Sequence, residues 1–255
     1  MREKEIMDLS NKVALVTGGS KGIGGATAIA LARRGADVAI VARNQGDQAR
    51  HTLAEIERAG RRGEFIEADM GVSAQATGCV EEVLHKLGRV DVLIHSAGGP
   101  VLGTLSEVTP EEWYRGFEVH VHAAFHLCRA AVPGMKERNE GAIILVSSIA
   151  GRRGVKTAIG YQTVKGALPQ MTRALAFELA DWNIRVNCVA PGIIRTDFHK
   201  QMPPEIQQHN VANRIPLHRE GTPEQVAQTI LELVTNDYIT GETVTVDGGL
   251  TMRIA

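Results

Sequence analysis

Short β-type runs alternate with longer helical runs along the whole of this 255-residue sequence. A strand that returns through a helix runs parallel to the strand before it, and helices that alternate in this way cover both faces of the sheet. The pattern therefore predicts an α/β fold, a doubly wound domain with a seven-stranded parallel sheet and helices on both faces. The strands are expected near 12–17, 37–42, 64–68, 90–95, 141–147, 184–190 and 243–247.

Composition and charge agree with one folded domain and disfavour several partners. With 44% hydrophobic residues, the chain has enough apolar side chains for one large core. A formal net charge of −1 gives no basic field for nucleic acid, and no run approaches the ~20 apolar residues of a membrane span. The beginning is charged, without an apolar signal core, and the cysteines show no CxxC spacing, so we expect a cytoplasmic protein without a structural metal. The expected organisation is an N-terminal extension over 1–10 and a single domain over 11–255.

The first predicted strand runs directly into a glycine-rich loop. The sequence Gly18-Gly-Ser-Lys-Gly-Ile-Gly24 follows this strand, and an apolar, helix-like run over 26–31 follows the loop. Glycines in this GxxxGxG pattern allow a tight turn and a close approach of the backbone, and the N-terminus of the next helix attracts a pyrophosphate. The loop therefore indicates a Rossmann-type dinucleotide site, with a purely structural strand-to-helix turn as the alternative.

The residues after the second predicted strand bear on the choice of cofactor. At this place an acidic side chain would bind the ribose 2′-hydroxyl of NAD, but the chain has Ala42 and Arg43. With Lys21 in the glycine loop, two cations can converge on a 2′-phosphate, and no carboxylate at these two positions repels it. We therefore predict NADP (NADPH) rather than NAD. The alternative is that Arg43 only solvates the end of a strand.

Tyr161 and Lys165 are four positions apart in a predicted helix, and Ser148 precedes Tyr161 by thirteen positions. Side chains four positions apart lie on one helix face, one turn from each other. A nearby ammonium favours the phenolate of a tyrosine, whose pKa is otherwise ~10. The hydroxyl of Ser148 can hold a carbonyl oxygen while Tyr161 donates its proton. The three residues predict acid/base chemistry, although a Tyr and a Lys at this spacing also occur by chance.

Together these motifs resemble the classical short-chain dehydrogenase/reductase family over nearly the whole chain after the N-terminal extension. The run 17–24 is similar to the family's cofactor loop, and Asp69 to its adenine-side aspartate. The three acid/base residues match the family's catalytic residues. Pro191-Gly192 with Thr196 is similar to the segment that lies beside the nicotinamide.

The closing run 239–249 resembles the 3-oxoacyl-acyl-carrier-protein reductase branch of that family. The resemblance implies an oxidoreductase that interconverts a carbonyl and a secondary alcohol, and a homo-oligomer, commonly a homotetramer. It implies catalytic roles for Ser148, Tyr161, Lys165 and, at the family's asparagine position, His120. The cofactor-binding residues that it implies are Gly18, Ser20, Lys21, Gly22, Ile23, Gly24, Arg43, Asp69, Met70, Ala97, Gly98, Tyr161, Lys165, Pro191, Gly192, Ile194 and Thr196.

Two positions depart from the family pattern. The fourth predicted strand is followed by a His-Ser-Ala-Gly run from His95, where the family usually has Asn-Asn-Ala-Gly, so this loop must be held by different hydrogen bonds. His120 stands where the family usually places a catalytic asparagine. We hypothesise that its imidazole substitutes in a water relay to Lys165; the alternative is that it only fills space. His122 and His126 share a helix face, but His120 points about 200° away from His122, so we expect no metal site; the alternative is a two-histidine site completed by another chain.

The sequence leaves the substrate open. The stretch near 193–218, which includes Phe198, breaks the alternation and predicts a substrate lid over the site. Arg152, Arg153 and Lys156 precede the acid/base tyrosine and either attract an anionic substrate or form a solvated loop. We expect NADPH-dependent reduction of a 3-oxoacyl thioester or similar ketone. The alternatives are a sugar-acid or polyol dehydrogenase and, less favoured, a non-catalytic dinucleotide-binding regulator.

Overall fold

The computed structural model, which describes residues 7–197 and 202–252, contains a seven-stranded parallel sheet in the order β3-β2-β1-β4-β5-β6-β7. The predicted doubly wound fold is confirmed, and each strand lies within two residues of its expected bounds. The strands are β1 (Val13–Thr17), β2 (Asp37–Ala42), β3 (Gly63–Glu67), β4 (Val92–His95), β5 (Gly141–Val146), β6 (Ile184–Pro191) and β7 (Thr243–Val246).

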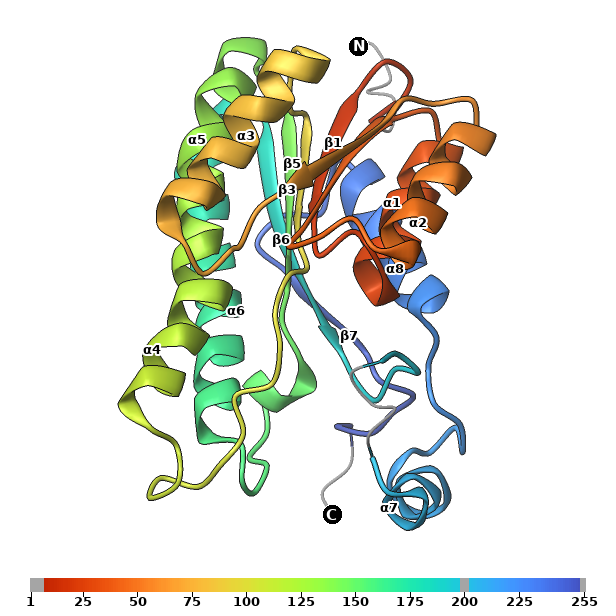
Figure 1. The fold of residues 1–255 in the computed structure, drawn as a ribbon, viewed down its shortest axis with the longest axis vertical. Helices are drawn as coiled ribbons and strands as arrows, with labels where there is room; N and C mark the ends of the chain where they lie inside the picture. The colour runs from red at the N-terminus through yellow and green to blue at the C-terminus, as the bar shows by residue number, and fades with distance from the viewer. Residues whose placement is uncertain (1–6, 198–201, 253–255) are drawn as a thin grey trace.

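Helices cover both faces of this sheet (Figure 1). One face carries α3 (Ser73–Leu87), α5 (Ala123–Arg138) and α6 (Ile159–Leu179), and the other carries α1 (Gly22–Arg33), α2 (Asp47–Arg58) and α8 (Pro223–Thr235). Successive side chains of a strand point to opposite faces, so Leu15 and Leu93 join one core cluster while Val16 and Ile94 join the other. Burial on both faces explains why the strands are almost continuously apolar.

The helix α4 (Pro110–Phe117) begins with a capping box. Glu112 donates its backbone N–H to the Thr109 hydroxyl, and the Glu112 carboxylate accepts the N–H of Thr109. The π-helical turn Glu118–His122 connects α4 to α5 without a break, and it contains the buried His120. Single π turns of this kind occur often at functional sites.

The carboxyl ends of the strands meet at one edge of the sheet, where Gly18 follows β1, Arg43 follows β2 and Ser147 follows β5. The order of the strands reverses between β1 and β4, and open sheets of this type bind ligands in the crevice at that point. The helix α7 (Pro204–His209) and the π-helical turn Asn210–Arg214 follow β6. Phe198, part of the predicted lid, lies outside the described residues.

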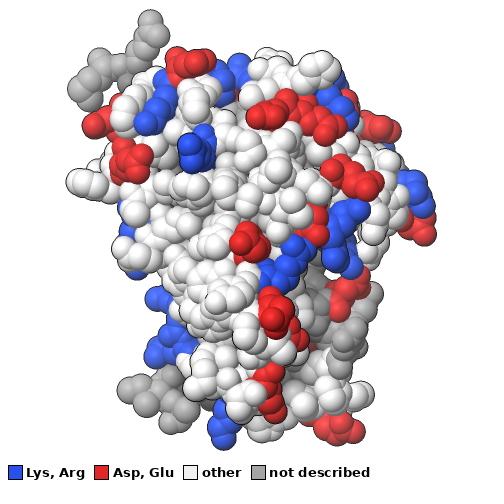
Figure 2. Space-filling view, turned by 60° about the vertical axis from the view of Figure 1, so that its left-hand side comes forward, with Lys and Arg blue, Asp and Glu red and all other residues white. Residues whose placement is uncertain are grey.

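Charged side chains of both signs are interspersed over the face shown in Figure 2, in keeping with the net charge of −1. In the part of the chain that the structure describes, no helix is both long enough and apolar enough to span a bilayer. The same residues contain no group of three or more His, Cys, Asp or Glu side chains placed to hold a metal ion.

Candidate active site

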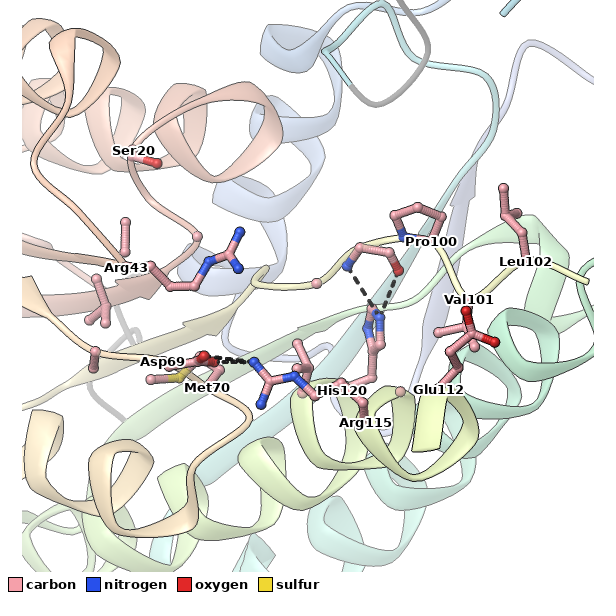
Figure 3. A pocket seen from close by; sticks show the side chains of 18 residues that line it. Ser20, Arg43, Asp69, Met70, Pro100, Val101, Leu102, Glu112, Arg115 and His120 are labelled. Carbon is pink, nitrogen blue, oxygen red and sulfur yellow. Dashed lines mark hydrogen bonds and ion pairs between the residues drawn. The ribbon is translucent and has the colours of Figure 1, made fainter. Parts of the chain in front are cut away.

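A cavity of about 390 Å³ opens at the carboxyl edge of the sheet (Figure 3). Part of its lining was predicted from the sequence, namely Gly18, Ser20, Arg43, Asp69, Met70, Gly98 and His120. The other predicted residues lie outside this lining, including the three acid/base residues. The lining also contains side chains that the sequence did not indicate, among them Pro100, Val101, Leu102, Glu112 and Arg115.

The glycine loop is packed so tightly that three of its glycines, Gly18, Gly19 and Gly24, have no room for a side chain. A Cβ on Gly18, whose φ is +66°, would lie 2.9 Å from backbone atoms of Ala97. A Cβ on Gly24 would lie 2.3 Å from the carbonyl oxygen of Gly18. Lys21 is the N-cap residue of α1, and among the described residues its side chain makes no capping hydrogen bond. The first turn of α1 contains no acidic residue. The first N–H groups of α1 are therefore open to an anion, and the loop fits the pyrophosphate of a dinucleotide.

The segment after β6 lies against the glycine loop. β6 ends at Pro191, and Gly192 donates its N–H to the end of β7 at 2.9 Å. Ile194 pairs with the segment that precedes α8, and the methyl group of Thr196 lies 3.5 Å from the place of a Cβ on Gly22. The residues predicted to lie beside the nicotinamide are thus next to the loop predicted to bind the pyrophosphate.

Lys21 is paired with Asp197 and does not line the cavity. Its Nζ lies 3.3 Å from Oδ2 of Asp197, which also accepts a hydrogen bond from Gln48 at 2.9 Å. Binding of a 2′-phosphate by Lys21 stays a prediction, and it requires Lys21 to exchange Asp197 for the phosphate. Arg43 does line the cavity, and it makes no hydrogen bond or ion pair with any other residue that the structure describes.

Asp69 is held by donors from two segments. Its Oδ1 accepts from the N–H of Gly71 at 2.9 Å, and Nη2 of Arg115 lies 2.7 Å from Oδ1 and 2.6 Å from Oδ2. Burial raises the pKa of Asp69, but the hydrogen bonds of Gly71 and Arg115 and the charges of Arg115 and Arg43 lower the pKa below its ordinary value. The sequence did not reveal Arg115, because it lies 46 positions from Asp69 and belongs to no recognised motif.

The loop after β4 is held through Thr17 at the end of β1. Nδ1 of His95 lies 2.9 Å from the Thr17 hydroxyl oxygen, which also accepts the N–H of Ala97 at 3.2 Å. Burial and the charge of Lys165 lower the pKa of His95 to about 4, although the nearby backbone of Val119 and His120 acts in the opposite direction. His95 is therefore a neutral, structural side chain at neutral pH.

His120 packs against the loop that follows β4. Its Nε2 lies 3.0 Å from the carbonyl oxygen of Gly99, and a Cβ on Gly98 would lie 2.1 Å from its Cε1. Burial and the charge of Lys165 lower the pKa of His120 to about 2, so the imidazole is neutral. Its ring centroid lies 6.0 Å from that of Tyr161, and its Nδ1 is buried with no partner among the described residues.

Ser148, Tyr161 and Lys165 come together beside the end of β5. Ser148 forms a hydrogen bond with Tyr161, and Nζ of Lys165 lies 5.7 Å from the Tyr161 ring centroid and donates to the Val146 carbonyl at 2.8 Å. Burial lowers the pKa of Lys165 to about 8. Burial also raises the pKa of Tyr161, and the bond with Ser148 offsets only part of that rise. The expected lowering of the Tyr161 pKa by Lys165 is not found here, because burial of the phenol sets the direction of the shift and Lys165 is not among its causes.

The carbonyl of Lys165 has a partner that the sequence did not reveal. Pro169, four positions later in α6, has no N–H to donate to this carbonyl. The hydroxyl of Ser147 donates to it instead, at 2.6 Å. A Cβ on Gly151 would lie 2.5 Å from the carbonyl carbon of Lys165, so the turn after β5 touches the backbone of α6. These contacts hold the acid/base serine and tyrosine in a fixed relation.

The two arginines that precede α6 line a second cavity, of about 570 Å³, together with Thr245, Asp247, Thr251 and Met252. Arg152 donates to the hydroxyl of Thr245 at 2.6 Å, and Arg153 donates to the carbonyl of Thr251 at 3.0 Å. Both side chains remain exposed. Their guanidinium groups therefore border a separate hollow beside β7, and they do not line the cavity that contains His120.

Known proteins match nearly the whole chain. Residues 18–251 match a family model described as Enoyl-(Acyl carrier protein) reductase. Dehydrogenase/reductase SDR family member 4 of Oryctolagus cuniculus is 37% identical over 250 residues, covering 96% of each chain. The 3-oxoacyl-[acyl-carrier-protein] reductase FabG of Chlamydia muridarum is 35% identical over 246 residues, covering 95% of this chain and 98% of the relative. A blue fluorescent protein from a metagenomic library, solved in complex with NADPH, has a TM-score of 0.89 at 35% identity, covering 96% of this chain and 100% of that chain.

Proposed function

The chain belongs to the short-chain dehydrogenase/reductase family of NAD(P)-dependent oxidoreductases that act on alcohols and ketones, and on this premise we propose that it reduces a ketone to a secondary alcohol with NADPH. A 3-oxoacyl thioester or similar ketone is the proposed substrate, which the 35% identity to a 3-oxoacyl reductase supports. One observation carries the proposal. Ser148, Tyr161 and Lys165 are neighbours at the sheet edge that also carries the glycine loop.

Each of these three side chains has its own role in the proposed reduction. Ser148 donates a hydrogen bond to the carbonyl oxygen, and Tyr161 gives its proton to the same oxygen. The bound cofactor supplies the hydride that the carbonyl carbon accepts, so a proton and a hydride together convert the ketone to the alcohol. Because burial raises the pKa of Tyr161, the phenol keeps its proton at neutral pH, as an acid in the reducing direction must. Lys165 binds the ribose and stabilises the phenolate that the proton transfer leaves.

A panel of substrates tests this proposal. NADPH absorbance is followed with acetoacetyl-CoA, simple cyclic ketones and keto sugar acids, and NADP reduction is followed with polyols. We expect the highest kcat/KM with the 3-oxoacyl thioester, and Tyr161→Phe serves as the control for contaminating reductases. Faster turnover of polyols or sugar acids would favour the alternative dehydrogenase. Binding of NADPH without turnover of any compound would favour a non-catalytic regulator.

The second cavity is the structural observation that supports the alternative function, a sugar-acid dehydrogenase. Arg152 and Arg153 border this hollow, and two guanidinium groups attract a carboxylate. Charge reversal in the double variant Arg152→Glu/Arg153→Glu is the direct test. If acidic substrates bind there, their KM rises while the KM of neutral ketones stays constant; an equal KM for acidic substrates in both proteins removes this alternative.

The organisation of the chain forms a further part of the proposal. We propose an N-terminal extension over 1–10, one catalytic domain over 11–255 and a substrate lid near 193–218. We also propose a homotetramer, on the basis of the family resemblance, and a cytoplasmic location, on the basis of the cysteine pattern. Light scattering of the purified protein at micromolar concentration measures the oligomeric state, and a monomer would contradict that part.

A further inference from the structure

The end of the cavity that follows β2 and β3 contains three interacting charges (Figure 3). Arg115 forms an ion pair with Asp69, with its Nη2 2.7 Å and 2.6 Å from the two carboxylate oxygens. Arg43 lies close enough to Asp69 for its charge to lower the pKa of that carboxyl, but it forms no ion pair with it. Asp69 is thus within the electrostatic reach of two guanidinium groups and is bound by only one of them.

The position of the Arg115 guanidinium depends on a glycine. A Cβ on Gly71 would lie 1.6 Å from Nη1 and 2.2 Å from Cζ of Arg115, so the guanidinium occupies the space of that missing side chain. The N–H of Gly71 donates to the same carboxylate at 2.9 Å. Gly71 therefore both binds Asp69 and leaves room for the arginine that neutralises it. The loop after β3 and the helix α4 meet at this contact.

Stability alone does not explain the Arg115–Asp69 pair. The two side chains are 46% and 30% exposed, and ion pairs at this exposure contribute about 0–1 kcal/mol to folding. The stronger consequence is local, because the carboxylate of Asp69 faces the cavity together with Arg43. The Arg115 guanidinium neutralises most of the charge of this carboxylate, so Asp69 attracts Arg43 only weakly. Without Arg115, it would attract Arg43 and repel any anion that Arg43 binds.

We propose that Arg115 is a specificity-determining residue for the cofactor, because its pairing with Asp69 leaves Arg43 available to the 2′-phosphate of NADP(H). This inference rests on the proposed use of NADPH. Loss of Arg115 acts against NADP(H) in two ways, through capture of Arg43 by Asp69 and through repulsion of the phosphate. Neither effect acts on NAD(H), which has a hydroxyl at this place.

Binding of the oxidised cofactors to the protein tests this role without turnover. Calorimetry gives the Kd of NADP⁺ and NAD⁺ for wild type, Arg115→Met and Gly71→Ala, and the readout is the ratio of the two Kd values. Because both cofactors share the adenine, any lost adenine contact cancels from this ratio. We expect the preference for NADP⁺ to fall about 5- to 10-fold in both variants, which corresponds to about 1 kcal/mol. The matched control Arg33→Met removes an arginine from the surface pair with Glu55 and leaves the ratio unchanged.

A third variant separates neutralisation of Asp69 from direct contact with the phosphate. In Arg115→Met/Asp69→Asn the carboxylate charge is gone, so the preference for NADP⁺ returns toward the wild-type ratio. Failure of this rescue would overturn the inference, and so would wild-type ratios in both Arg115→Met and Gly71→Ala with unchanged Tm. A wild-type preference for NAD⁺ would instead overturn the proposed use of NADPH. The two failures are therefore distinguishable.

Discussion

The two ends of the proposed active site differ in whether their ionisable groups are stabilised in the charged or in the neutral form. After β2 and β3, Arg43, Asp69 and Arg115 lie around an open cavity, and the pKa of Asp69 is below its ordinary value because cations surround it. After β4 and β5, burial dominates, and it lowers the pKa of Lys165 to about 8 and that of His120 to about 2. One end retains ionised groups and the other end favours neutral ones.

This difference matches two different tasks. Recognition of a charged ligand group needs fixed charges that a ligand can reach, and partly exposed arginines provide them. Transfer of a proton needs groups whose protonation is set by their surroundings, and burial sets it. Because the two sets of side chains lie at different places along the carboxyl edge of the sheet, a substitution at one end is expected to leave the other function intact. The predictions below test that separation.

Tyr161→Phe has the largest expected effect. Removal of the general acid lowers kcat about 10²- to 10⁴-fold, whereas the Kd of NADPH stays close to wild type because the charged end is unchanged. Turnover is measured with the best substrate of the panel, and the Kd is measured by calorimetry. An unchanged kcat would show that Tyr161 is not the general acid. An equal loss of NADPH affinity would show that the two ends do not act independently.

Arg43→Ala is expected to produce the opposite pattern. Loss of a charge-assisted contact with the 2′-phosphate weakens NADPH binding about 10- to 100-fold, while NADH binding and the kcat at saturating NADPH change little. The Michaelis constants for both cofactors are compared in wild type and variant. A wild type that prefers NADH would contradict the cofactor assignment.

His120 gives a smaller effect at the buried end. If its neutral imidazole serves the relay to Lys165, His120→Ala lowers kcat about 10-fold and His120→Asn retains or improves it. Because the pKa of His120 is about 2, it contributes no titration to the pH profile of kcat near neutral pH. Wild-type turnover in His120→Ala would show that the ring only fills space.

Lys165→Met tests the smallest effect, on folding stability. The pKa of Lys165 is about 8 in the folded chain, where the amine is buried, and 10.5 in the unfolded chain, where it is not. Below pH 8 both states carry the charge, so the cost of burying the charged amine is present in full. As the pH rises from 8 to 10.5, the folded chain has already released the proton and this destabilisation disappears. The shift from 10.5 to about 8 corresponds to about 3 kcal/mol of pH-dependent destabilisation. The lost hydrogen bond to the Val146 carbonyl offsets about 2 kcal/mol of it, so the variant is expected to be about 1 kcal/mol more stable near neutral pH and to lose that advantage as the pH rises toward 10.5. Chemical denaturation across this range measures it, and a difference independent of pH would show that the amine is not buried as a cation.

The fold and much of the candidate site were predictable from local patterns. Apolar strands that alternate with helices specify a parallel sheet, and the glycines from Gly18 to Gly24 mark the strand-to-helix turn that they form. The spacing of Tyr161 and Lys165 placed both on α6, with Ser148 at the end of β5. These are short-range relations, and the helical and strand periodicities express them directly.

Contacts between distant segments were not predictable in this way. Lys21 meets Asp197 across 176 positions, and Arg115 meets Asp69 across 46, so neither pair leaves a pattern in the sequence. The direction of the Tyr161 pKa also depended on the tertiary structure, because burial is a property of the packed fold. The sequence by itself determined which chemical groups stand at the carboxyl ends of the strands. The packing of loops and helices around them decided which charges are paired, which are buried and which remain free for a ligand, because these energies depend on distance and solvent exposure rather than on order along the chain.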